Sequence, residues 1–124
     1  MTAAPELLGA RMDAVAAVIR GHRYRYASEV ELQDQLEQVL RAAGVPVRRE
    51  VRLSDRDRID LLAGDVGIEV KVKGERTPLR QLGRYAEHEE VAGLLLVTTR
   101  AATVPEQLRG KPVRLVSLLT NGLA

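Results

Sequence analysis

A run of aliphatic residues interrupted by charges most restricts how this chain can fold. In segment 67–73 the apolar residues Ile68, Val70 and Val72 alternate with Glu69, Lys71 and Lys73. This period of two predicts a strand with one apolar face, so Glu69 and Lys71 share the other face. If that face is covered, the pair must bind each other, a metal ion or an ionic substrate, because burying a lone charge is costly. On an exposed strand the same alternation needs no partner.

The segment from Ser28 to Gly44 predicts a helix that directs one carboxylate inward. Ser28 suits the N-cap, and Gly44 marks the expected end. Its apolar stripe consists of Leu32, Leu36, Val39, Leu40 and Ala43. At helical spacing Glu29 falls within this stripe, whereas Glu31, the capping-box residue, points away. Glu29 is therefore the candidate functional acid. Stabilisation of the helix dipole is an alternative role that can coexist with it.

A second helix is predicted to begin at Pro78, a residue suited to a first helical turn. Gln81, Tyr85 and His88 follow one another along one flank of its apolar side. The flank predicts a hydrogen-bonding stripe beside the core, with Arg84 on the more exposed side. For His88 alone we favour an ordinary boundary between the buried and solvated faces.

These segments together resemble the PD-(D/E)xK, or restriction-endonuclease-like, nucleases over roughly residues 28–99. The motif aspartate corresponds to Asp60, preceded by Ile59 where the family name has proline. The ExK triplet corresponds to Glu69, Val70 and Lys71. The resemblance therefore rests on residues in the expected order and on the expected elements.

Two further motifs are similar to particular branches of that family. Glu29 matches the helix glutamate ahead of the first strand, and the segment Glu29 to Leu32 resembles the E-x-E-L of archaeal Holliday-junction resolvases. The segment Gln81 to Tyr85 resembles the Q-x-x-x-Y motif of the RecB-like branch. The two features favour resolvases and exonucleases respectively, and the sequence does not separate them.

The resemblance implies a metal-dependent DNA nuclease whose hydrolysis leaves a 5′-phosphate. Asp60 and Glu69 would hold Mg²⁺, with Mn²⁺ as a substitute, assisted by the Val70 carbonyl and by Glu29 directly or through water. Lys71 would orient the attacking water and stabilise the transition state. The remaining roles fall to Gln81, which would position water or substrate, and to Tyr85 behind it.

Two other function classes remain open. One is a nucleic-acid-binding or assembly module that keeps this fold without cleavage. The other is an unrelated α/β interaction domain in which Glu69 and Lys71 form a structural ion pair.

The predicted fold is α/β, with a restriction-endonuclease-like αβββαβ core preceded by an extra N-terminal helix. Helices are expected at about 5–20, 28–44, from Pro78, and briefly near 105–108, and strands at 45–53, 58–63, 67–73, 93–98 and 112–118. The continuous apolar run at 93–98 indicates a strand covered on both faces. A mixed sheet flanked by helices would enclose Asp60, Glu69 and Lys71. Residues 1–27 form the N-terminal helix and connection, and residues 28–124 the core, of one compact domain.

The composition excludes several classes of site. The 124 residues contain no cysteine, which removes disulfides and thiol catalysis. No stretch approaches the roughly 20 apolar residues of a membrane span, and the N-terminus has no signal-peptide pattern. A cytoplasmic protein without membrane contact is the expectation.

Sixteen of the 19 basic residues are arginine, the side chain that binds phosphate through a planar fork. A GC-rich genome would give the same bias. Arg23, Tyr24 and Arg25 lie in a segment that alternates basic and aromatic residues, so they are candidates for binding DNA phosphates and bases. The equal alternative is that the tyrosines pack this loop onto the core.

DNA is the expected partner, and either a homodimer or a specificity-giving protein partner would fit a chain this short. The apolar stripe of the N-terminal helix would serve as the dimer interface or pack on its own domain. The acids Asp55, Asp57 and Asp65 lie in turn-like sequence, where solvated charge is ordinary. We therefore leave them out of the site, together with Lys73.

Overall fold

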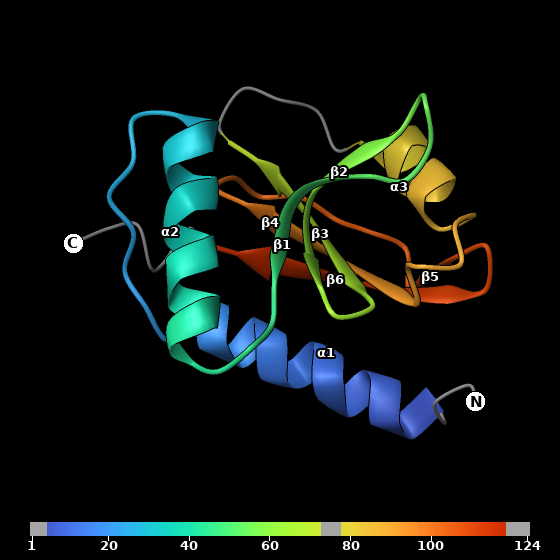
Figure 1. Cartoon of the computed structure of the whole chain (residues 1–124), viewed down its shortest axis with the longest axis horizontal. Coiled ribbons are helices and arrows are strands. Elements are labelled where there is room, and N and C mark those ends of the chain that lie inside the picture. Colours follow the sequence, from blue (N-terminus) through green and yellow to red (C-terminus); the bar gives the residue numbers. More distant parts are fainter. Residues whose placement is uncertain (1–4, 73–77, 119–124) are drawn as a thin grey trace.

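The computed structural model describes residues 5–72 and 78–118, without the side chains of residues 5 and 6. Its elements are α1 (Pro5–Arg20), α2 (Glu29–Ala42), β1 (Arg48–Arg52), β2 (Arg58–Ala63), β3 (Val66–Lys71), α3 (Leu79–Tyr85), β4 (Gly93–Thr98), β5 (Gln107–Leu108) and β6 (Lys111–Ser117) (Figure 1). The predicted α/β class and the order of the elements through β4 are confirmed.

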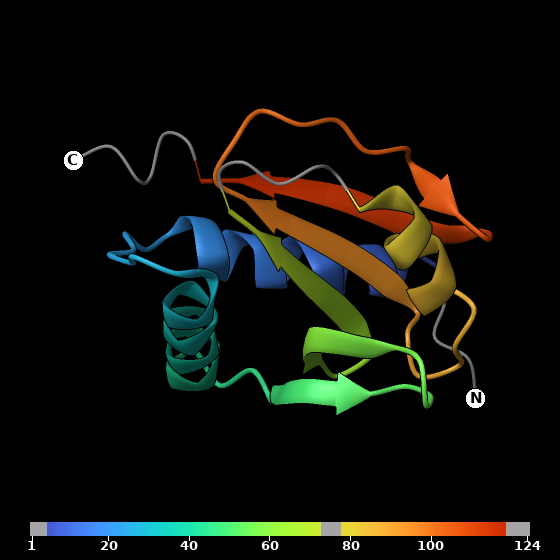
Figure 2. The same ribbon diagram turned by 90° about the horizontal axis from the view of Figure 1, so that it is seen from above.

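The strands form one mixed sheet in the order β1-β2-β3-β4-β6-β5. The pairs β1–β2, β2–β3 and β5–β6 are antiparallel, whereas β3, β4 and β6 are parallel (Figure 2). The carboxyl ends of β3 and β4 therefore meet at one edge of the sheet. The candidate residues Glu69 and Lys71 lie at that end of β3.

Two apolar layers enclose the sheet. One layer joins α1 and α2 to β3, β4 and β6 through residues such as Met12, Leu36 and Ile68. The other joins α3 to β2 and β4 through Leu82 and Leu94 among others. All six residues of β4 are buried, which confirms the prediction of a strand covered on both faces.

Local signals in the sequence account for the ends of α2. The Ser28 hydroxyl accepts the Glu31 backbone N–H at 3.2 Å, and the Glu31 carboxylate accepts the Ala27 N–H at 3.1 Å. At the other end Gly44 has a φ of 82°, the left-handed conformation that glycine adopts without strain. The predicted N-cap and glycine stop are thus confirmed, while Glu31 binds the N–H of Ala27 and not that of Ser28, as a capping box would have it.

The apolar stripe of α1 packs on the protein's own sheet. Met12 and Ile19 are fully buried, and the Met12 sulfur lies so close to Gly93 that a Cβ at that position would come within 2.6 Å of it. Of the two alternatives for this helix, the structure supports packing on its own domain. In the described part of the chain, no helix combines the length and apolar character needed to cross a membrane.

The short helix predicted near residues 105–108 is wrong. Gln107 and Leu108 form β5, which pairs with β6 through Gln107 opposite Pro112. The turn between the strands holds Arg109 at φ 54° and Gly110 at φ 76°. Two successive positive φ values favour a tight hairpin, because such a turn matches the twist of the flanking strands.

Two predicted strands are shorter than expected. Of the strand expected at 45–53, only Arg48–Arg52 is a strand, namely β1. The one expected at 67–73 ends at Lys71, and Lys73 lies outside the described residues.

Candidate active site

Asp60 lies where β2 and β3 separate. The paired positions of these strands run from Ala63 opposite Val66 to Leu61 opposite Ile68. Beyond these pairs, the backbone N–H of Val70 in β3 points towards β2 and donates to Oδ2 of Asp60 at 2.8 Å. A side-chain carboxylate thus takes the place of a backbone acceptor, and it is held beside Glu69.

Glu69 is almost completely enclosed, with 2% of its surface exposed. Its Oε2 lies 3.6 Å from Nζ of Lys71, whose side chain is 19% exposed. Its Oε1 is buried and has no hydrogen-bond partner among the described residues. A buried acceptor without a partner is costly, so this oxygen is available for a ligand.

The electrostatics of this pair favour the neutral form of Glu69. Burial, followed by the negative charge of Asp60, raises the pKa of Glu69 to about 8, against the opposing charge of Lys71. Burial also raises the pKa of Asp60, while the Val70 N–H and Lys71 counteract the rise. Two adjacent desolvated carboxyl groups are stabilised when a cation reaches them.

Tyr85 stands behind this pair. Its hydroxyl donates to the carbonyl of Arg58 at 2.9 Å, which attaches α3 to the start of β2. Burial, and then the charges of Glu69 and Asp60, raise the pKa of Tyr85, as expected for a ring beside both acids. Gln81 lies one helical turn earlier and is partly exposed. Of the predicted hydrogen-bonding residues of this helix, Tyr85 is therefore the one that lies beside Asp60 and Glu69.

Glu29 lies in the first turn of α2 and is held within a polar network. Nε2 of Gln33 donates to Oε1 of Glu29 at 3.3 Å, and Arg49 donates to Oε1 of Gln33 at 3.3 Å. Arg49 also binds Asp34 at 2.7 Å and Glu37 at 3.2 Å, so it ties β1 to α2. Among the side chains of residues 7–72 and 78–118, no three acidic or histidine groups cluster closely enough to hold a metal. Asp60 and Glu69 adjoin, and Glu29 does not complete a triad with them.

The prediction that Asp57 is a solvated turn residue is wrong. Asp57 is 5% exposed. Its two carboxylate oxygens bind Nε of Arg84 at 2.9 Å and Nε2 of His88 at 3.1 Å. The hydrogen bond from Arg84 is the main reason why the pKa of Asp57 is lowered, against the effect of burial. His88 lies in the turn after α3, which ends at Tyr85, so the predicted helical stripe does not extend to it. No helical spacing in the sequence therefore marked Arg84 and His88 as partners of one acid.

The basic and aromatic connection uses its first tyrosine for packing. Tyr24 is 6% exposed, and its hydroxyl donates to the carbonyl of Ile19 at 2.7 Å. Its ring is therefore covered and presents no face on which a base can stack. Arg23 and Arg25 are exposed.

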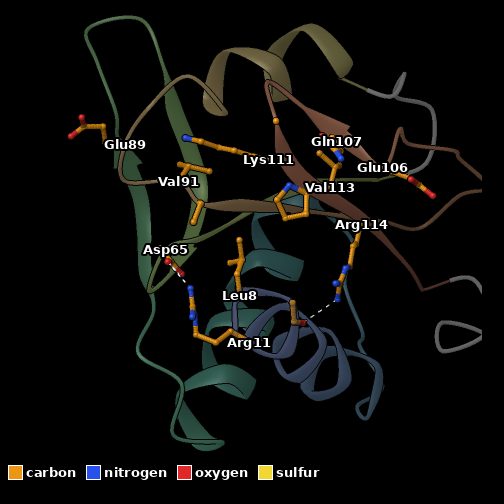
Figure 3. A pocket seen from close by; sticks show the side chains of 14 residues that line it. Leu8, Arg11, Asp65, Glu89, Val91, Glu106, Gln107, Lys111, Val113 and Arg114 are labelled. Carbon is orange, nitrogen blue, oxygen red and sulfur yellow. Dashed lines mark hydrogen bonds and ion pairs between the residues drawn. The ribbon is translucent and has the colours of Figure 1, made fainter. Parts of the chain in front are cut away.

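A cavity lies at the opposite end of the parallel strands from Glu69 and Lys71. It has a volume of about 820 Å³ and lies between α1, the β2–β3 turn and the β5–β6 hairpin, at the amino ends of β4 and β6 (Figure 3). Leu8, Val91 and Pro112 line it. Arg11 and Asp65 also line it and form an ion pair, with 2.7 Å between the guanidinium nitrogen and the carboxylate oxygen. No candidate site residue contributes to it.

A smaller hollow of about 350 Å³ lies at the carboxyl ends of β3 and β4, beside the start of α2. Ser28, Val72 and Thr99 line it. It occupies the same end of the sheet as Glu69 and Lys71.

Comparison with protein families, curated proteins and solved structures finds no match for this chain.

Proposed function

We propose that this protein is a metal-dependent DNA nuclease with a restriction-endonuclease-like core. The observation that carries the proposal is the grouping of Asp60, Glu69 and Lys71 where β2 and β3 part. Oε2 of Glu69 lies 3.6 Å from Nζ of Lys71. The Asp60 carboxylate binds the backbone N–H of Val70, the residue between them on β3. Glu69 is almost completely buried, and Asp60 and Lys71 are only partly exposed. An ordinary solvated strand face therefore does not explain these three charges.

The residues present suit a magnesium ion. Mg²⁺ keeps several waters and is usually held by one or two carboxylates together with substrate phosphate. Asp60 and Glu69 supply those carboxylates, and the buried Oε1 of Glu69 has no hydrogen-bond partner in the described ranges. When bound, the ion would lower the pKa of a bound water and polarise the scissile phosphate.

The chain's own groups divide the remaining work. Lys71 orients the attacking water and offsets negative charge in the transition state. Tyr85 supports the acids through its bond to the Arg58 carbonyl. Gln81 stands on the same helical flank, where it positions water or substrate. Glu29, anchored through Gln33, acts on the site through water.

A cleavage assay tests the proposal. Single-stranded, duplex, nicked, flapped and four-way-junction DNA are incubated in Mg²⁺, Mn²⁺ or EDTA with the wild type, Asp60→Asn and Lys71→Ala. Asp55→Asn is the matched control, because Asp55 is an exposed acid on the turn before β2. Metal-dependent cleavage that both site variants lose and the control keeps is the expected result.

Other outcomes point to the alternatives. A folded wild type that binds DNA equally well in EDTA and cleaves none of these substrates would indicate a binding module. A wild type that does neither, and that Lys71→Ala strongly destabilises, would indicate a structural ion pair.

A further inference from the structure

Exposed arginines without acidic partners gather on the β1–β2 hairpin. Arg48, Arg52, Arg56 and Arg58 are all exposed. Among the described residues none of the four forms an ion pair, whereas Arg11, Arg41, Arg49, Arg84, Arg109 and Arg114 each pair with a carboxylate. The exposed acids of the hairpin are Glu50 and Asp55. Its exposed charge is therefore predominantly positive.

Two of these arginines stand directly opposite each other. Arg52 of β1 pairs with Arg58 of β2 in the sheet register, so their side chains share one face. Like charges directly opposite each other across a strand pair are destabilising. Arg52 donates one N–H to the backbone carbonyl of Asp55 at 3.1 Å. Because this acceptor is neutral, the positive charge of Arg52 stays uncompensated. An anion between the two guanidinium groups would relieve their repulsion.

The hairpin borders the candidate active site. Arg58 lies two residues before Asp60 on β2, and its carbonyl receives the Tyr85 hydroxyl. Asp57 ties the hairpin to α3 through Arg84, so the hairpin lies beside that helix (Figure 1). A polyanion held by Arg52 and Arg58 would therefore run alongside Asp60 and Glu69.

We propose that Arg52 and Arg58, with Arg56 at the turn, bind adjacent phosphates of a nucleic-acid backbone. This inference rests on the proposed nuclease function and specifies how its substrate is held. Guanidinium groups bind phosphate through two parallel hydrogen bonds. Such contacts fix the position of the nucleic acid and carry no base specificity.

The test measures DNA binding in EDTA as a function of salt concentration. The proteins compared all carry Asp60→Asn and differ by Arg52→Gln, Arg58→Gln, both changes, or the control Arg109→Gln. Arg109 is an exposed arginine of the β5–β6 turn. The logarithmic salt slope for duplex DNA should fall in magnitude by about 0.9 for each phosphate that a variant no longer neutralises. It should remain unchanged in the control.

A second measurement separates weaker binding from poor folding. Without DNA and at low salt, the double variant should resist urea at least as well as its parent, because the opposing charges are gone. Arg52→Lys keeps the charge but not the planar fork, so it should retain the salt slope and bind more weakly.

The outcomes distinguish this inference from the nuclease proposal. An unchanged slope in the double variant, with a wild type that cleaves DNA, would overturn the arginine contacts alone. A slope that depends on the hairpin in a protein that never cleaves would support the contacts and overturn the nuclease. A wild type that does not bind DNA would overturn both.

Discussion

The carboxylate of Asp60 accepts the Val70 backbone N–H at 2.8 Å, where a backbone carbonyl of β2 would otherwise continue the sheet. One side chain therefore ends the β2–β3 pairing and fixes an acid beside Glu69. This dual role means that structural and chemical effects of changing Asp60 can be separated by the choice of substitution.

Asp60→Asn should abolish cleavage and leave stability equal to or above that of the wild type. The amide oxygen still accepts from Val70, and a desolvated charge disappears. Asp60→Ala should lower the free energy of unfolding by about 1–3 kcal/mol, because it leaves a buried N–H without its acceptor. Urea unfolding of the two variants checks this difference. Equal destabilisation would contradict the role of the Val70 bond.

The stability of the metal-free protein should fall as pH rises from about 5 towards 8. The folded pKa of Glu69 is raised to about 8 from 4.5 by burial and by Asp60. The folded state therefore holds a proton that the unfolded chain has released, and linkage makes stability decrease across that window. The contribution of Glu69 is complete below the unfolded pKa and disappears above the folded one.

Glu69→Gln is the matched control for this pH dependence. The glutamine cannot ionise, so its unfolding free energy should lack the decline attributed to Glu69 between these pH values. Urea titrations at several pH values compare the two proteins. An identical decline in both would show that another group is responsible.

Lys71→Ala should reduce cleavage by about 10²–10³-fold, as expected when a charge-stabilising donor is removed. Lys73→Ala should leave it unchanged. Single-turnover rates at saturating metal measure the effect. Removal of Lys71 should also raise the pKa of Glu69 further, because its positive charge opposes the rise. The reverse ranking of the two lysines would refute the assignment of Lys71.

Asp57→Ala should lower the free energy of unfolding by about 1–3 kcal/mol, because it removes two charged hydrogen bonds in a buried setting. Its lowered folded pKa means that this contribution is present above about pH 4 and is lost as pH falls through the folded value. The destabilisation on substitution should therefore be larger at pH 7 than in strong acid. Asp55→Ala, at an exposed turn position, should have little effect on unfolding.

Residues close together in the sequence determined the elements. The period of two around Glu69, the continuous apolar run of β4 and the cap residues of α2 are all patterns within a few residues, and the strand, the doubly covered strand and the helix ends that they predict are confirmed. The bounds predicted for α1, β2 and β4 agree with the structure. The placement of Glu69 and Lys71 on one strand face follows from the same period of two.

Only the tertiary structure decided which polar residues are buried. Asp57 looked like a turn acid because its partners Arg84 and His88 lie 27 and 31 positions later. Arg49 likewise gained its role from α2, and Tyr24 from the end of α1. The sequence by itself set the local dihedral preferences and the apolar faces. The packing of α3 and α2 against the sheet determined which side chains the buried polar residues bind, because burial depends on which distant surfaces meet.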